Sequence, residues 1–234
     1  MPRARRIAVI AAMVYATGFG LPAALGASLN LSSNALTTFH TCVLSGVSSS
    51  GTVNTDSYVN QGNVTQNNGT ATTMTVNSAS SNTRSYIRFD LTKCSPLIPS
   101  SAAVDLATLR LFTTGVPNAC RTQDVFRVTS AWTESAITWN TQPFGTTINN
   151  PPSAQATGSM AIGSGCAVNT TNNTYVTGWT VTTDVAAFVS GTTNNGWMIR
   201  DDAEGSSTGR NSTYVTRDAS NAARAPQLVV DYTT

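Results

Sequence analysis

Apolar and polar residues alternate along many short segments of this chain. In residues 85–91 every second residue is apolar, namely Ile87, Phe89 and Leu91, and the residues between them are more polar. Residues 108–112 repeat the pattern with leucines. A period of two places side chains on opposite faces of an extended backbone, so each segment predicts a β-strand. Further strands are predicted in residues 36–44, 57–60, 72–76, 124–129, 196–200, 212–217 and 227–232.

Turn-forming residues separate the predicted strands. Asn-Asn-Gly occurs at residues 67–69 and again at 194–196, and each triplet favours a tight turn. Residues 45–55 and 141–165 are polar and rich in Gly, Ser, Thr or Pro, which predicts long loops. The fold class expected from this pattern is all-β: an antiparallel β-sandwich of jelly-roll type with at most one short helix.

The short helix is predicted in residues 181–189. Val185 and Phe188 fall on one face at helical spacing, and Thr183 or Asp184 is expected to cap the first turn. A Ser-Gly pair follows, and its glycine is expected to end the helix.

The first residues have the pattern of a secretory signal. Residues 1–6 contain three arginines and no acid, residues 7–25 are almost wholly apolar, and Leu-Gly-Ala at 25–27 supplies the small residues of a cleavage site. A membrane anchor is the alternative, but the apolar stretch is only marginally long enough and contains Gly and Pro. We therefore expect a signal peptide at 1–27 and a secreted, extracellular protein with no membrane span after cleavage.

Cleavage after residue 27 would change the charge of the chain. The full sequence has 13 basic and 11 acidic residues, and three arginines lie in the signal. The mature chain would therefore carry 10 basic residues and a formal charge of −1. Nucleic acid and anionic membranes bind concentrated basic patches, so neither is an expected partner.

The mature chain is expected to be a monomer with one main domain. Residues 28–55 are predicted to form an N-terminal strand and loop packed on that domain, and residues 56–234 to form the β-sandwich.

The four cysteines, an even number in an exported chain, predict two disulfides. Their spacing alone allows three pairings. We predict Cys42–Cys94, which would tie the N-terminal strand to a later one, and Cys120–Cys166, which would close two long loops. A zinc site is not expected, because no pair has C-x-x-C spacing and the chain has a single histidine.

Several segments occur in an order that resembles a known family. The most specific is residues 128–143, with Trp132, Glu134 and Trp139. The others are residues 56–59, 68–69, 72–76, 88–91, 107–111, 197–200, 216–218 and 226–232. Over this span the chain resembles the DNRLRE family of exported β-sandwich modules, which overlaps carbohydrate-binding module family 96. The resemblance implies a carbohydrate-binding sandwich, and members that bind acidic polysaccharide are thought to use basic side chains.

Four arginines on predicted strands are candidate ligand-binding residues. They are Arg88, Arg217, Arg200 and Arg110. A guanidinium can hold a carboxylate or sugar hydroxyls with two parallel hydrogen bonds, and Arg88 and Arg217 are the leading candidates. The alternative is a set of structural ion pairs across strands. The aspartates available for such pairs are Asp90, Asp201, Asp218 and Asp231.

Flat aromatic side chains also bind sugars, because sugar rings stack on their faces. Tyr86, Trp179 and Trp197 are candidates for such a surface. Trp132 and Trp139 are expected in the core.

The acidic cluster Asp201, Asp202 and Glu204 offers oxygens to calcium, a hard cation. Its spacing lacks the regularity of a dedicated calcium loop, so a solvated loop is favoured. No other cofactor is expected.

Nothing in the sequence has the pattern of a catalytic site. There is no G-x-S-x-G motif, His40 has no apparent orienting partner, and Glu134 is expected to brace the turn at Trp132. We therefore predict a secreted, non-catalytic module that binds a polysaccharide or cell-surface glycan. The alternatives are a structural or adhesive extracellular protein without a sugar ligand and, less favoured, an enzyme acting on polysaccharide.

Overall fold

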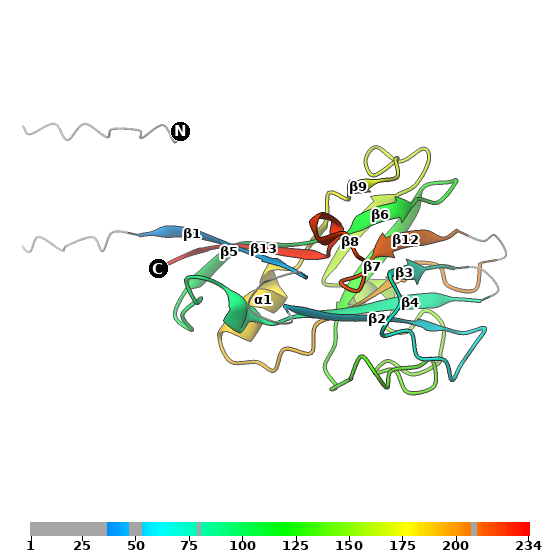
Figure 1. Ribbon diagram of the computed structural model, residues 1–234, viewed down its shortest axis with the longest axis horizontal. Coiled ribbons are helices and arrows are strands. Elements are labelled where there is room, and N and C mark those ends of the chain that lie inside the picture. The colour runs from blue at the N-terminus through cyan, green and yellow to red at the C-terminus, as the bar shows by residue number, and fades with distance from the viewer. Residues whose placement is uncertain (1–36, 47–52, 79–80, 207–209) are drawn as a thin grey trace, which may run out of the picture. The chain divides into compact units, whose positions relative to one another are not determined.

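The structure is a computed structural model that describes residues 37–46, 53–78, 81–206 and 210–234 (Figure 1). The predicted signal peptide lies outside these residues. The strands are β1 (Phe39–Ser45), β2 (Asn54–Asn60), β3 (Thr73–Val76), β4 (Thr83–Phe89), β5 (Ala103–Arg110), β6 (Phe112–Gly115), β7 (Arg121–Arg127), β8 (Gly158–Ile162), β9 (Thr174–Tyr175), β10 (Trp179–Thr180), β11 (Trp197–Asp201), β12 (Ser212–Val215) and β13 (Gln227–Thr233). The helices are α1 (Thr182–Val189) and the short 3-10 helices η1 (Leu91–Lys93), η2 (Ser153–Gln155) and η3 (Ala222–Arg224).

The strands form three antiparallel sheets, which confirms the predicted all-β sandwich. Their orders are β1-β13-β5-β10, β2-β4-β11-β7-β8 and β3-β12-β6-β9. The first sheet joins the two ends of the described domain, since β1 pairs with β13 along its whole length (Figure 1). Within the described ranges, no helix has both the length and the apolar content needed to cross a membrane.

Alternation predicts the inward face of the first sheet well. In β13 the side chains of Leu228, Val230 and Tyr232 are buried, while the residues between them are partly exposed. The buried side chains join a core cluster with residues of the other two sheets, including Ile87 and Met74. This shared core holds the sheets together.

The five-stranded sheet is buried on both faces, which the alternation pattern does not reveal. One face contributes Ile87 and Trp197 to the shared core. The opposite face packs Tyr86 and Met198 into a second cluster under the loop that contains Trp132. Every residue of β11 is consequently buried.

Helix α1 lies where the sequence predicts it, but neither Thr183 nor Asp184 caps its first turn. Its N-cap residue is Val181, and no side chain caps the first turn. Asp184 instead accepts hydrogen bonds from Thr157 and from Trp197. The helix ends as expected, because Gly191 adopts a positive φ of 104° just after it.

The loop predicted at residues 141–165 is only partly correct. Strand β8 lies within it and pairs with β7, and the Gly-Ser-Met-Ala-Ile sequence gives weak alternation. Strands β9 and β10 are two residues each and were also not predicted. Such short strands form because a neighbouring strand offers hydrogen-bonding groups, a tertiary effect.

Both predicted disulfides are confirmed. Cys42 of β1 is bonded to Cys94, just after η1, with their Cα atoms 5.6 Å apart. Cys120 is bonded to Cys166 with a Cα separation of 4.9 Å, and it closes the end of the β7–β8 pair.

Candidate functional site

The aromatic residues proposed as candidates for a sugar-stacking surface are buried. Tyr86, Trp179 and Trp197 have no exposed surface. The Trp179 indole donates to the carbonyl of Gln123 over 2.9 Å, and the Trp197 indole donates to Oδ2 of Asp184 over 2.8 Å. All three rings lie in the core clusters, so they offer no face to a sugar.

Trp132 and Trp139 are buried, as expected. Their exposed fractions are 6% and 2%. The Trp132 indole donates to the carbonyl of Asn195 over 2.8 Å, and the Arg84 guanidinium lies 4.9 Å from the centre of the Trp139 ring. All four tryptophans of the chain thus serve packing, which removes tryptophan stacking as a binding mode.

Arg200 and Arg110 differ in how the fold holds them. Arg200 is fully buried and donates to the backbone carbonyls of Asp201 and Pro151, both over 2.6 Å. Its expected place on an open sheet face is corrected, because the loop before β8 covers it. Arg110 is partly exposed and lies 5.3 Å from the ring centre of Tyr175.

Arg88, like Arg110, has a ring contact but no hydrogen bond or ion pair to the described residues, and unlike Arg110 it lines the pocket described below. It lies on β4 opposite Thr55 of β2, and its guanidinium is 5.8 Å from the centre of the Trp132 ring. The side chain is partly exposed and has no hydrogen bond or ion pair to any residue that the structure describes. Its N–H donors are therefore free to bind an external acceptor.

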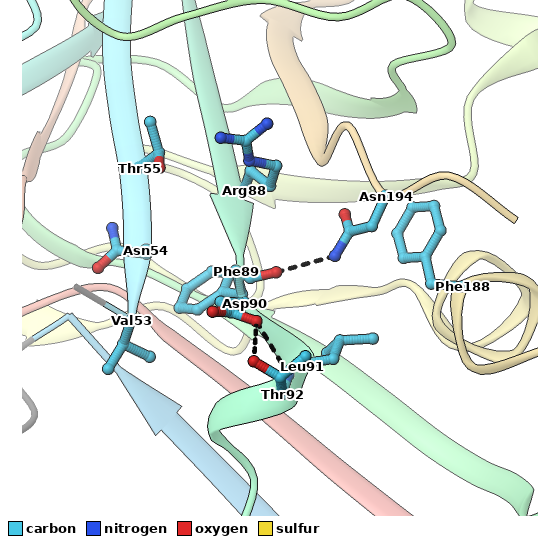
Figure 2. A pocket seen from close by; sticks show the side chains of 10 residues that line it. All are labelled: Val53, Asn54, Thr55, Arg88, Phe89, Asp90, Leu91, Thr92, Phe188 and Asn194. Carbon is cyan, nitrogen blue, oxygen red and sulfur yellow. Dashed lines mark hydrogen bonds between the residues drawn. The ribbon is translucent and has the colours of Figure 1, made fainter. Parts of the chain in front are cut away.

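Arg88 lines a pocket of about 480 Å³ (Figure 2). Its walls come from the ends of β2 and β4, from η1, from α1 through Phe188 and from the segment before β11 through Asn194. Asn194 donates its amide to the carbonyl of Phe89 over 2.8 Å. Asp90 accepts from the hydroxyl of Thr92 over 2.6 Å. The pocket therefore contains polar groups whose orientation is fixed by hydrogen bonds, those of Asn194 and Asp90, together with apolar side chains.

Arg217, the other leading candidate, is held by carboxylates. Its Nε donates to Oε1 of Glu134 over 3.0 Å, and its terminal nitrogen donates to Oε2 of the same residue. Nε also lies 3.7 Å from Oδ2 of Asp218. The ion-pair alternative therefore describes Arg217 in this structure, with Glu134 as its main partner.

Asp56 completes this network and was not singled out as a site residue from the sequence. It is 1% exposed, and its Oδ2 accepts from the Arg217 backbone N–H over 3.0 Å and from the Asn54 amide over 2.6 Å. Burial raises the pKa of Asp56 to about 7, the charge of Glu134 adds to the rise, and the two hydrogen bonds oppose it. Burial also raises the pKa of Glu134. No local pattern could connect these two residues, because 78 positions separate them.

The acidic loop was expected to be solvated, with calcium as the weaker alternative, but Asp201 and Glu204 are buried and the loop has arginine partners. Arg121 pairs with Asp201 and Asp202, and Arg84 pairs with Glu204 through Nε at 2.6 Å. The three carboxylates do not converge as metal ligands in the described part of the chain.

Comparison with known protein families identifies the family of this chain. The model of carbohydrate-binding module family 96 matches residues 48–232, a range that includes the whole pocket. This match confirms the family 96 side of the resemblance seen in the sequence. A search of curated proteins found no match.

Proposed function

The chain belongs to carbohydrate-binding module family 96, and from this membership we propose that it is a secreted, non-catalytic module that binds polysaccharide in the pocket of Arg88. One observation carries the choice of pocket. Arg88 lines it and keeps its guanidinium donors unpaired with respect to the described residues.

The pocket has the composition of a sugar site. Its volume of about 480 Å³ falls within the range of roughly 300–1,000 Å³ found for small-molecule pockets. The partly exposed Leu91 supplies apolar surface for the C–H groups of a sugar ring, and Thr55 and Asn194 supply polar groups for hydroxyls.

The charges in the pocket allow two ways of binding. Arg88 can donate to a pair of hydroxyls or to the carboxylate of an acidic sugar. Asp90 can accept from a hydroxyl, because only one of its oxygens bonds to Thr92. Neutral and acidic polysaccharides therefore both belong in the test.

The pocket supports binding rather than glycoside hydrolysis. Hydrolysis ordinarily uses a pair of carboxyl groups on the two sides of the scissile bond. Among the described residues that line the pocket, Asp90 is the one carboxylate.

The experiment measures binding of the purified module to neutral and acidic polysaccharides by isothermal titration calorimetry. We expect Arg88→Ala to weaken binding at least about tenfold, as the loss of a hydrogen bond to a charged group implies. The matched control is Arg224→Ala, an exposed arginine outside the pocket. Equal affinity of the Arg88→Ala variant and the native protein would show that the sugar does not bind in this pocket. No binding to any polysaccharide would refute the proposed function.

Secretion is supported by the two disulfides, since disulfides persist in oxidising compartments. N-terminal sequencing of the protein from culture medium should give a chain that begins after residue 27. Retention of the whole protein in the cell would contradict the proposal.

A structural or adhesive module without a sugar ligand is the second candidate. It is favoured by three exposed apolar residues on the β1-β13-β5 sheet: Phe39, Val43 and Leu106. Concentration-dependent self-association together with a blank polysaccharide panel would select this candidate.

A further inference from the structure

Three carboxylates from distant parts of the chain meet at one point. Asp56 lies on β2, Glu134 in the loop after β7 and Asp218 after β12. One carboxylate oxygen from each lies within 4.8 Å of the others. Three oxygens at this spacing can bind one hard cation.

The buried member of this cluster has an unpartnered oxygen. Asp56 is 1% exposed, and both of its side-chain hydrogen bonds go to Oδ2. Its Oδ1 is buried and has no hydrogen-bond partner among the described residues. A buried carboxylate oxygen without a partner is costly, so it points to a ligand that completes its environment.

The charge balance of the cluster leads to the same conclusion. Among the residues that the structure describes, Arg217 is the positive charge that contacts it, through Glu134 at 3.0 Å and Asp218 at 3.7 Å. When all three carboxylates are ionised, one guanidinium leaves two negative charges uncompensated. A divalent cation would neutralise the cluster completely.

We propose that Asp56, Glu134 and Asp218 form a calcium site. The available ligands are oxygens alone, without the imidazole or thiolate that zinc prefers, and calcium accepts carboxylates with water in irregular geometry. The ion would link three parts of the chain: β2, the loop after β7 that covers the five-stranded sheet, and the turn after β12. None of the three carboxylates lines the sugar pocket, although Asn54, which donates to Asp56, does, and the calcium test does not depend on sugar binding.

The test is calorimetric titration of the EDTA-treated, dialysed protein with calcium chloride, alongside thermal unfolding with and without calcium. We expect one site with a dissociation constant of roughly 10⁻⁴–10⁻³ M, the range of extracellular calcium modules. We also expect calcium to raise the unfolding temperature by several degrees. No heat of binding and no change in unfolding temperature at 10-fold higher calcium, about 10⁻² M, would overturn the proposal; the alternative is then a proton on Asp56.

Variants locate the ion. Asp218→Asn changes an exposed residue and is expected to leave the fold intact, while weakening calcium binding at least about tenfold through loss of ligand charge. Asp202→Asn, in the acidic loop beside Arg121, is the matched control and should bind as the native protein does. Undiminished binding by Asp218→Asn, or loss confined to Asp202→Asn, would place the ion elsewhere and overturn the site.

Discussion

Arg84 and Glu204 form an ion pair in which both side chains are fully buried, with Nε of Arg84 2.6 Å from Oε1 of Glu204. A second bond joins the Arg84 terminal nitrogen to Oε2 over 2.8 Å. Glu204 also accepts from the backbone N–H of Asn149 over 2.7 Å. The pair therefore fixes the loop after β11 to β4 and to the loop before β8.

Glu204→Gln should destabilise the fold by about 3–5 kcal/mol, because it leaves the buried charge of Arg84 without its partner. Chemical denaturation measures the free energy of unfolding. Asp105→Asn, at an exposed position on β5, is the control and should change it by less than about 0.5 kcal/mol. A similarly small effect of Glu204→Gln would show that the pair does not stabilise the fold.

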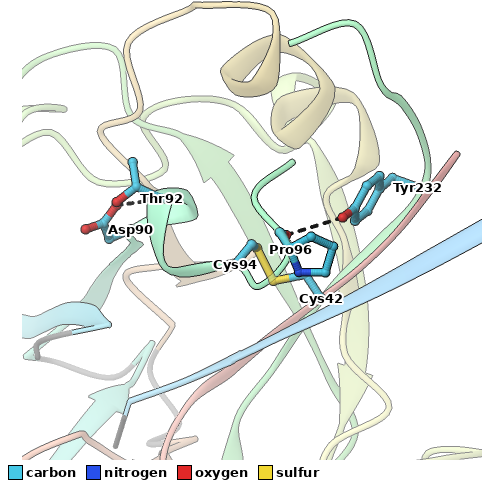
Figure 3. The surroundings of a disulfide bond; sticks show 6 residues. All are labelled: Cys42, Asp90, Thr92, Cys94, Pro96 and Tyr232. Carbon is cyan, nitrogen blue, oxygen red and sulfur yellow. Dashed lines mark hydrogen bonds between the residues drawn. A yellow bond between two sulfur atoms is a disulfide. The ribbon is translucent and has the colours of Figure 1, made fainter. Parts of the chain in front are cut away.

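Removing the Cys42–Cys94 disulfide with the double substitution to alanine should cost about 2–4 kcal/mol of stability. The bridge spans 52 residues and ties β1 to the chain that follows η1 (Figure 3). Urea denaturation measures the loss, and reduction of the native protein provides a parallel comparison. Non-reducing peptide mapping that found Cys94 bonded to Cys120 would contradict the arrangement.

Gly69→Ala should destabilise the protein by about 1–3 kcal/mol, the usual effect of overpacking. A Cβ at Gly69 would lie 2.3 Å from the carbonyl oxygen of Glu134, which cannot move freely because Asn67 also bonds to it. Gly115→Ala is the control, since its Cβ would come no closer than 3.2 Å to a side chain, that of Thr213. Equal stability of the two variants would contradict the close approach.

Arg88→Lys should weaken sugar binding nearly as much as Arg88→Ala. A lysine keeps the charge at the pocket but lacks the planar pair of donors that a guanidinium presents. Titration calorimetry on both variants separates the two contributions. Full retention of affinity by Arg88→Lys would show that charge alone matters.

The sequence by itself determined the strands with strong alternation, the short helix and the all-β class. Leu228, Val230 and Tyr232 show why: a single covered face leaves its period of two in the sequence. The even number of cysteines and their places beside predicted strands were enough to propose both disulfides, and the order of the family segments was enough to identify the family. Arg88 was proposed from the sequence as a ligand-binding residue, and the structure adds that it lines a pocket, which the sequence did not predict.

The tertiary structure decided what covers each face and which distant residues meet. Alternation tells which side chains share a face of a strand, but not whether a loop packs on that face, and so the ligand-binding candidates Tyr86, Trp197 and Arg200 all lie inside. Asp56 and Glu134 meet although 78 positions separate them. Such a meeting depends on the packing of the whole sandwich, and local sequence patterns carry no record of it.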